Sequence, residues 1–401
     1  MSTVYQKVAL CILVLSVATL SFWSWVLMDP NFTLISHADW TLFREFMINI
    51  GYKNRGLSWN IYLPSIILLS LSSLYLSIRP VKKPFVWVVL VGIIAAIFSY
   101  PALSHDLFNY IFDAKILTVY GQNPYLHKAL DFPADPMIRF MRWIHRAYPY
   151  GPSYLLLSLI PSYLGFGIFS LTYFMFKGMH LVLYLFAAKR LEKISKTAVM
   201  LFAFSPLVIV EGLINTHNDF IALTLGVIAV TYIFENKNKL LTRVLLWSSM
   251  LTKFTALPVV ILSERWFFTI LSKKIKLVRV LIDVGSLEKT SFLALLTIIV
   301  YQSLKMEVQS WYFLNLLIFI PYFPRLFKWM SPFIFSLILS YYPYIIGGEW
   351  GQGGDVNVKK MIINVGAFVN VVLIFAFLYI PQIIVESKKM FHTERPSVKP
   401  V

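Results

Sequence analysis

Long apolar runs recur along this chain, and they limit its fold more than any other feature of the sequence. Four of them, at residues 8–28, 85–103, 166–188 and 361–385, each reach about the 20 residues that a helix needs to cross a bilayer. Of the 401 residues, 58% are hydrophobic and 14% are charged, whereas a soluble domain carries about 25% charged residues. The composition therefore excludes a soluble fold, and the runs predict an all-α polytopic membrane protein.

The first run, residues 8–28, differs from a cleaved signal peptide. Lys7 supplies a short basic segment before it, but the run is longer than the apolar core of a typical signal peptide. It ends in the aromatic-rich sequence FWSW at residues 22–25, where a cleavage site would require small residues. We expect a retained first helix. Because the only cysteine, Cys11, lies inside it, a disulfide or cysteine-metal framework is excluded.

The formal net charge of +17 bears on topology rather than on nucleic acid. The basic residues are spread over short loops instead of forming one stripe, which argues against nucleic-acid binding. With the N-terminus inside and the spans alternating, 23 of the 36 Lys and Arg residues fall in inside segments and 11 in outside segments, while Lys177 and Lys253 remain within spans. Such a bias orients membrane proteins. We predict a multi-pass protein of the plasma (inner) membrane with both termini cytoplasmic.

Ten spans are predicted, at residues 8–28, 59–78, 85–103, 166–188, 197–214, 219–235, 290–304, 309–323, 331–347 and 361–385. The segment 152–164 is apolar but short, and 244–263 has basic loops assigned to the same side at both of its ends. Each of these two fits a re-entrant segment or a pair of short helices, which membranes tolerate where protein buries the broken backbone or a cavity is lined. We therefore expect about ten to thirteen transmembrane or re-entrant helices in a single domain, 1–401, with a disordered cytoplasmic tail at 386–401.

The longest outside segment, 104–151, is predicted to be a structured extracytoplasmic catalytic loop. A helix can begin at Ser104 and run to residue 119, with Gly121 as its stop. A second helix is predicted to start at residues 135–136. It would lie in the membrane interface and turn three arginines toward lipid head groups: Arg139, Arg142 and Arg146.

The sequence SHDLFNY at residues 104–110 contains the first candidate catalytic group, Asp106. In the first turn of a helix the helix dipole favours a carboxylate. An ionised Asp at the membrane surface is suited to accept a proton from a hydroxyl nucleophile. The alternative is that Asp106 only starts the helix, and residue chemistry alone does not decide between the two.

A second polar stretch, EGLINTHND, occupies residues 211–219. Glu211, Asn215 and Asn218 follow the spacing i, i+4, i+7, which places them on one face if the helix continues that far. Acidic residues near the outer end of a span usually face a cavity, but a hydrogen-bond cluster between helices would use the same residues. His217 on its own is more typical of a structural role than of a ligand.

Lys253 lies at the centre of an apolar stretch. If that stretch folds back, Lys253 reaches the outer turn and can meet a phosphate; otherwise it reaches an interface or pairs with a buried acid. Trp311 and Tyr312 begin another span and fit an aromatic belt without any catalytic role. The sequence contains no P-loop and no dinucleotide-binding fingerprint, so a cytosolic nucleotide-sugar site is not predicted.

In order along residues 100–315, these motifs resemble those of the GT-C superfamily mannosyltransferases that use polyprenol-phosphate mannose, most closely the bacterial α-mannosyltransferases. The resemblance rests on SHDLFNY, GQNPY at 121–125, YGP at 150–152, EGLINTHND, TK at 252–253 and WY at 311–312. Many relatives carry paired acids, whereas here His105 precedes a single Asp106. The sequence therefore leaves open whether the site binds a metal, and a divalent cation is the one cofactor considered. In much of the superfamily the acidic motif follows the first span, which makes Asp39 the fallback site.

The resemblance implies inverting transfer of a hexose, mannose, from a polyprenyl-phosphate donor to the hydroxyl of an extracytoplasmic glycan or glycolipid. It implies Asp106 as the general base with His105 beside it, and Lys253 with one of the three arginines opposite the leaving phosphate. The remaining substrate-binding residues that it implies are Tyr110, Asn123, Tyr125, Glu211, Asn215, His217, Asn218, Asp219, Trp311 and Tyr312.

Three other functions fit a polytopic membrane protein: a transporter or flippase for a lipid-linked sugar, a lipid-linked oligosaccharide ligase, and a noncatalytic scaffold. Transporters commonly show two related halves, and the sequence shows no internal repeat. A transporter also rarely needs a structured outside loop as long as 104–151.

Overall fold

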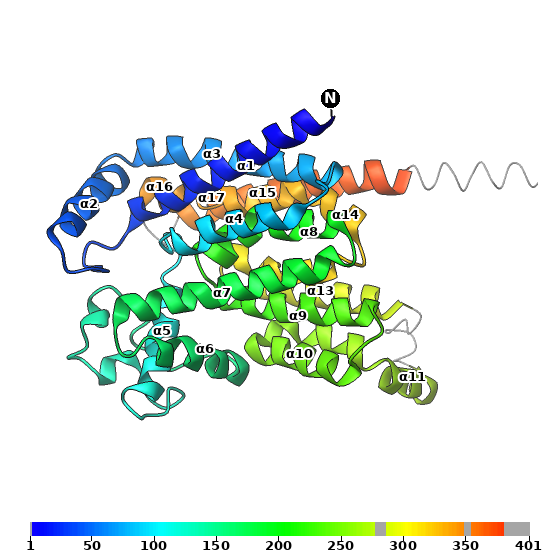
Figure 1. Ribbon diagram of the computed structural model, residues 1–401. Coiled ribbons are helices and arrows are strands. Elements are labelled where there is room, and N and C mark those ends of the chain that lie inside the picture. The colour runs from blue at the N-terminus through cyan, green and yellow to red at the C-terminus, as the bar shows by residue number, and fades with distance from the viewer. Residues whose placement is uncertain (1, 277–285, 349–353, 381–401) are drawn as a thin grey trace, which may run out of the picture.

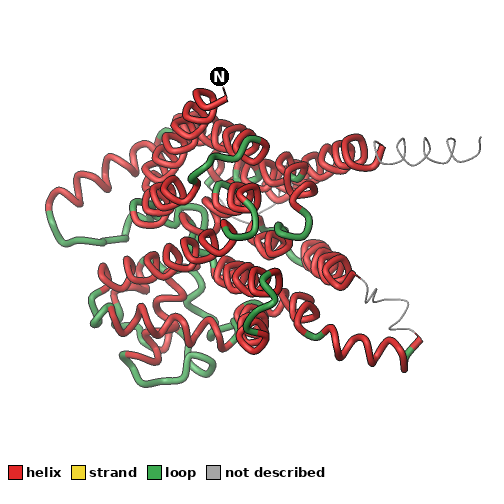
Figure 2. Tube along the Cα trace, turned by 45° about the vertical axis from the view of Figure 1, so that its right-hand side comes forward, coloured by secondary structure: helices red, strands yellow, loops and turns green. Residues whose placement is uncertain are grey.

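The computed structural model of the protein describes residues 2–276, 286–348 and 354–380. It is 77% helix, and the described residues form no strand, which confirms the predicted all-α class (Figure 2). The predicted tail at 386–401 lies outside the described residues.

Five of the helices are long and apolar enough to cross a membrane. They are α1 (Ser2–Trp23, continued by the 3-10 helix η1, Ser24–Leu27), α3 (Arg55–Ile78), α7 (Phe169–Glu192), α13 (Leu287–Lys305) and α17 (Gly354–Ile374, continued by η9, Phe375–Tyr379). Two bent pairs raise the number of candidate spans to seven if each pair is one span. Shorter apolar helices include α4 (Pro84–Ile97) and α9 (Asn218–Phe234).

Two predicted spans are interrupted. The span expected at 197–214 consists of α8 (Lys196–Ala203) and η5 (Val208–Ile214), which meet at 61°. Pro206 lies in the break, where proline disfavours helical backbone in the residue before it. The span expected at 331–347 is interrupted only at residues 340–341, between α15 (Ser331–Leu339) and α16 (Tyr342–Gly347), and counts as one apolar helix.

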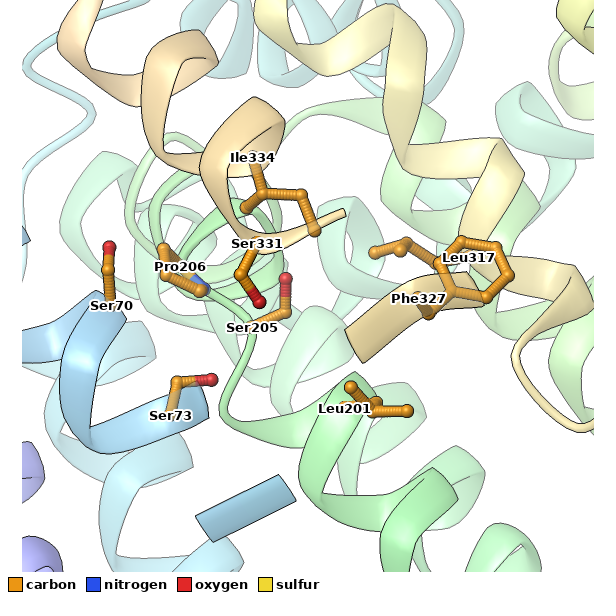
Figure 3. Close-up of a pocket in the computed structure, with 9 residues that line it drawn as sticks. All are labelled: Ser70, Ser73, Leu201, Ser205, Pro206, Leu317, Phe327, Ser331 and Ile334. Carbon is orange, nitrogen blue, oxygen red and sulfur yellow. The ribbon is translucent and has the colours of Figure 1, made fainter. Parts of the chain in front are cut away.

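The α8–η5 break borders a small cavity that Figure 3 shows. Its volume is about 20 Å³, and the hydroxyls of Ser70, Ser73, Ser205 and Ser331 lie around it. The Ser205 Oγ atom is buried and has no hydrogen-bond partner among the described residues. A cavity of this size has room for about one water molecule, so it is too small for a sugar.

The segment 244–263 is a pair of short helices, which confirms one of the two arrangements predicted for it. The first is α10 (Lys239–Thr252) and the second is the 3-10 helix η6 (Phe254–Ser263). Lys253 separates them with extended backbone, at φ −138° and ψ 110°. The other short apolar segment is the single helix α6 (Pro152–Leu164), which begins with proline as helices often do.

The loop at 104–151 begins as predicted and then departs from the prediction. The first helix is α5 (Asp106–Thr118), and Gly121 follows it with a positive φ of 63°. The prediction of a second helix, with Arg139, Arg142 and Arg146 on one face, is wrong. Only a 3-10 turn, η4 (Pro136–Arg139), forms there.

Asp135 explains this departure, because its carboxylate bonds both the backbone of the 3-10 turn and two side chains of the preceding part of the loop. Its Oδ1 atom accepts from the backbone N–H of Met137 at 2.9 Å, and its Oδ2 atom accepts from the Tyr120 hydroxyl at 2.6 Å and pairs with Lys115 of α5. These contacts tie the loop back to α5. The chain that carries Arg142 and Arg146 then continues in irregular backbone.

The helices form one bundle with distinct ends (Figure 1). The left end in Figure 1 carries α2 (Ala38–Ile48), α5 and α16, and the right end carries α11 (Arg265–Lys274) and α14 (Pro324–Trp329). At the α5 end, the fully buried ring of Phe32 lies 5.1 Å from the Tyr100 ring and 5.4 Å from the rings of Phe108 and Phe140. Such aromatic packing adds to the stability of a core. It connects the first loop to α5, which carries Asp106.

Candidate active site

A cavity of about 1060 Å³ opens at the α5 end of the bundle. Its walls include the loop at 104–151, the break between α10 and η6, and the start of η8 (Ser310–Phe319). The structure brings seven of the predicted site residues to it: His105, Asp106, Arg142, Arg146, Lys253, Trp311 and Tyr312. The volume is at the upper end of the range for small-molecule sites, so it can hold a sugar together with a phosphate.

Asp106 is the carboxylate at the wall of this cavity. It is the first residue of α5, its backbone N–H donates to Ser104 Oγ at 3.2 Å, and the Tyr110 hydroxyl donates to its Oδ2 atom at 3.4 Å. Burial raises the pKa of Asp106, but His217, Arg146 and Lys253 outweigh it and hold the pKa below its usual value. Asp106 is therefore a carboxylate at neutral pH, as a general base requires.

Three predicted cationic side chains line the same cavity, together with Arg55, the first residue of α3. The Lys253 Nζ atom lies 2.7 Å from Asp219 Oδ2 and 5.3 Å from the centre of the Tyr150 ring. Arg146 donates to the Tyr150 hydroxyl at 3.4 Å, and Arg142 donates to His105 Nδ1 at 3.3 Å. Of the roles left open for Lys253, the structure shows a pair with a buried acid at a position that also faces the cavity.

His105 is neutral in this arrangement. Burial and the charge of Arg142 lower its pKa to about 4, although Asp106 acts in the opposite direction. Its Nδ1 atom accepts the hydrogen bond from Arg142, so at neutral pH the single N–H of the ring is on Nε2.

Gly151 fixes the distance between two walls of the cavity. A Cβ atom at this position would lie 1.8 Å from the carbonyl oxygen of Leu251, two residues before Lys253. Only glycine allows the loop backbone to approach α10 this closely.

A layer of polar side chains lies behind the cavity rather than in its wall. Glu211, Asn215, His217 and Asn218 are fully buried, and none of them lines the cavity. Asn215 Nδ2 donates to Glu211 Oε2 at 3.0 Å, and the Tyr341 hydroxyl donates to Glu211 Oε1 at 2.7 Å. The structure therefore places this stripe as a hydrogen-bond cluster between helices.

Side chains in and beside this layer also contact charged residues that line the cavity. The Tyr110 hydroxyl, which donates to Asp106, also lies 3.2 Å from Asn218 Oδ1. Asp219, with 1% of its surface exposed, binds Lys253. The polar layer thus contacts Asp106 and Lys253, whose side chains are 14% and 16% exposed.

Three predicted site residues lie elsewhere. Asn123 Oδ1 accepts from the backbone N–H of Tyr125 at 3.0 Å, as in an Asx-turn, and the Tyr125 hydroxyl donates to the Tyr150 carbonyl at 3.2 Å. Arg139 is exposed and outside the cavity lining, and so is Asp39, whose side chain is 85% exposed.

Several cavity residues were not among the predicted site residues, although one of them, Tyr150, belongs to the YGP motif. They are Tyr52, Arg55, Tyr150, Gln302, Glu307, Gln309 and Tyr344. Glu307 and Gln309 stand two to four residues before Trp311, so the Trp-Tyr motif was the one signal near them. In the described part of the chain, no three His, Cys, Asp or Glu side chains are grouped as the ligands of a metal would be.

The motifs and the cavity agree with a comparison against protein families. A family model described as "Alpha-(1->6)-mannopyranosyltransferase, N-terminal domain" matches residues 4–266. Comparisons with curated proteins and with solved structures gave no match. The matched range includes Asp106, Arg146 and Lys253, whereas Glu307 and Trp311 follow it.

Proposed function

The chain belongs to the alpha-(1->6)-mannopyranosyltransferase family, and we propose that it transfers a mannosyl unit from a polyprenyl-phosphate donor to an acceptor hydroxyl. The acceptor is a glycan or glycolipid outside the membrane. The observation that carries the proposal is a single cavity lined by an ionised Asp106 and by Arg142, Arg146 and Lys253. A base and a set of cations are what this transfer requires.

In the proposed reaction Asp106 takes the proton of the acceptor hydroxyl while that oxygen attacks the anomeric carbon. The bond between the anomeric carbon and the phosphate oxygen breaks, and the lipid phosphate leaves with the electron pair. Attack from the face opposite the leaving group inverts the anomeric configuration. The products are the glycosylated acceptor, polyprenyl phosphate and a protonated Asp106, which returns its proton to water.

The leaving phosphate is stabilised by the cations. Arg146 bonds the Tyr150 hydroxyl and lies over the Trp143 ring, and its charge acts on Asp106 only at longer range, so its N–H groups can bind a phosphate. Lys253 is partly balanced by Asp219. Positive groups fixed where charge develops lower the barrier of a transfer reaction, and arginine is well suited to phosphate oxygens.

The donor is tested by supplying it in two forms. The purified protein is incubated with an acceptor and either polyprenyl-phosphate mannose or nucleotide-activated mannose. We expect glycosylated acceptor and released polyprenyl phosphate with the lipid donor only. Transfer from the nucleotide sugar alone would contradict the proposed donor.

The proposed orientation places the cavity outside the membrane, and it rests on the split of basic residues. In a Cys11→Ser background, a single cysteine in place of Gln122, which is exposed in the loop at 104–151, should react with a membrane-impermeant thiol reagent added from outside. Cysteines at Lys193 and Lys237, both exposed, should react only after the membrane is opened. Labelling of Lys193 or Lys237 positions from outside would overturn the orientation and, with it, the choice of an outside acceptor.

A further inference from the structure

His217 lies between two carboxylates in the polar layer behind the cavity. Its Nδ1 atom is 3.6 Å from Asp106 Oδ2, and its Nε2 atom is 3.4 Å from Glu211 Oε2. The His217 side chain is fully buried, so water does not compete for either nitrogen. The three side chains form a row from the wall of the cavity to the interior of the bundle.

The two neighbours define the protonation state of the ring. A neutral imidazole has one N–H, so one of its nitrogens would turn a lone pair toward a carboxylate oxygen. An imidazolium has two N–H groups and presents one to each carboxylate. Glu211, which is also fully buried, receives further donors from Tyr341 and Asn215, as a buried carboxylate requires.

The face of the His217 ring is covered by an aromatic ring. The Trp311 ring stacks on it with centroids 4.0 Å apart and an angle of 21° between the planes. A cation over the face of tryptophan is stabilised by the ring quadrupole. Trp311 lines the cavity, so it also separates the buried ring from the substrate.

The charged and titratable groups around His217 come from several elements. Asp106 faces it from α5 and Glu211 from η5; the pair of Asp219 and Lys253 lies beyond, and α7 contributes His180 and Lys177. The Lys177 Nζ atom donates hydrogen bonds to Ser99 Oγ at 3.0 Å and to the carbonyl oxygens of Leu213 and Ile214. Both groups in direct contact with the His217 nitrogens are therefore acidic.

We propose that His217 is a positioning residue that works as an imidazolium, holding the Asp106 carboxylate ionised and oriented while Glu211 balances its charge. The inference rests on the proposed function, in which Asp106 is the base. Its physical basis is that burial alone would raise the pKa of Asp106, and His217 is the main group that lowers it. Without His217, Asp106 would take up a proton and lose its ability to act as a base as the pH falls.

The test compares transfer rates across pH for two matched variants, His217→Gln and His180→Gln. Both histidines are fully buried, but His180 bonds the Phe176 carbonyl and does not contact Asp106. We expect the wild-type rate to be level between about pH 6 and 8. The His217→Gln rate should fall about tenfold for each pH unit below the raised pKa of Asp106, and recover as the pH rises. His180→Gln should keep the wild-type profile, and a His217→Gln profile parallel to the wild type would overturn the inference.

A second measurement on the wild-type protein needs neither the variant nor any activity. In protein labelled with ¹⁵N-histidine, one of the seven histidine rings should remain doubly protonated at about pH 8. Its signal should move in Asp106→Asn, which removes one of its two carboxylate neighbours. If all seven rings are neutral at that pH, the inference is wrong even if the protein transfers mannose. If the signal is present but no transfer occurs, the proposed function fails instead.

Discussion

Asp106→Asn should lower the rate of mannosyl transfer by about 10²–10⁴-fold, the range that general-base catalysis typically contributes. Asparagine keeps the size of the side chain and an oxygen that can accept from the Tyr110 hydroxyl. The carboxylate that would take the acceptor proton is lost. The measurement is the initial rate of transfer at saturating donor, normalised to the folded protein recovered in detergent.

The matched control is Asp39→Asn, at the other acidic site considered from the sequence. The Asp39 side chain is 85% exposed and pairs with His37 outside the cavity lining, so its rate should stay within a few-fold of wild type. If Asp39→Asn abolished transfer while Asp106→Asn did not, the base would lie in the first loop.

Lys253→Met should have the second large effect. It removes a cation from the cavity and leaves the buried carboxylate of Asp219 without its partner. A hydrogen bond to a charged group contributes about 1.5–3 kcal/mol, so donor affinity should fall roughly 10- to 100-fold. The unpaired Asp219, with 1% of its surface exposed, should also destabilise the protein, since breaking a buried ion pair costs about 3–5 kcal/mol. Donor binding and thermal unfolding are measured on the same preparation.

The double variant Lys253→Met/Asp219→Asn separates these two effects. It removes the buried charge together with its partner, so the unfolding temperature should return toward wild type. Donor affinity should remain low, since the cation is still absent. If the double variant recovered donor affinity as well, Lys253 would serve only as the structural partner of Asp219.

Much of the fold was predictable because apolar runs and basic loops act locally. The helix α5 and its stop at Gly121 follow from residues within a few positions of each other, and the pair of short helices at 244–263 follows from the basic loops at both ends of that segment. The break at Pro206 was missed, although proline is a known local signal. The prediction of a second loop helix was wrong: Asp135 caps only the short 3-10 helix η4, and its other carboxylate oxygen bonds back to Lys115 and Tyr120.

The candidate site was predictable where a charged residue or a short motif marked it in the sequence. Asp106 and Lys253 stood out as charges beside or within apolar segments, and the structure places both at the cavity. Glu211 and His217 were grouped with substrate-binding residues, yet they lie behind the wall, because sequence spacing does not tell a cavity wall from the layer beneath it. Arg55 lines the cavity because the first turn of α3 lies at this end of the bundle, a tertiary arrangement that has no local signal in the sequence.

The most direct test of the central claim follows the sugar and the lipid in one reaction. Wild-type protein and Asp106→Asn, each reconstituted in liposomes, receive polyprenyl-phosphate mannose labelled in the sugar, together with an acceptor. We predict that wild type releases one polyprenyl phosphate for each mannosyl unit found on the acceptor, and that the Asp106→Asn reaction falls to the background rate. If mannose instead stays on the lipid while the intact donor changes leaflet, the protein moves a lipid-linked sugar and is not a transferase.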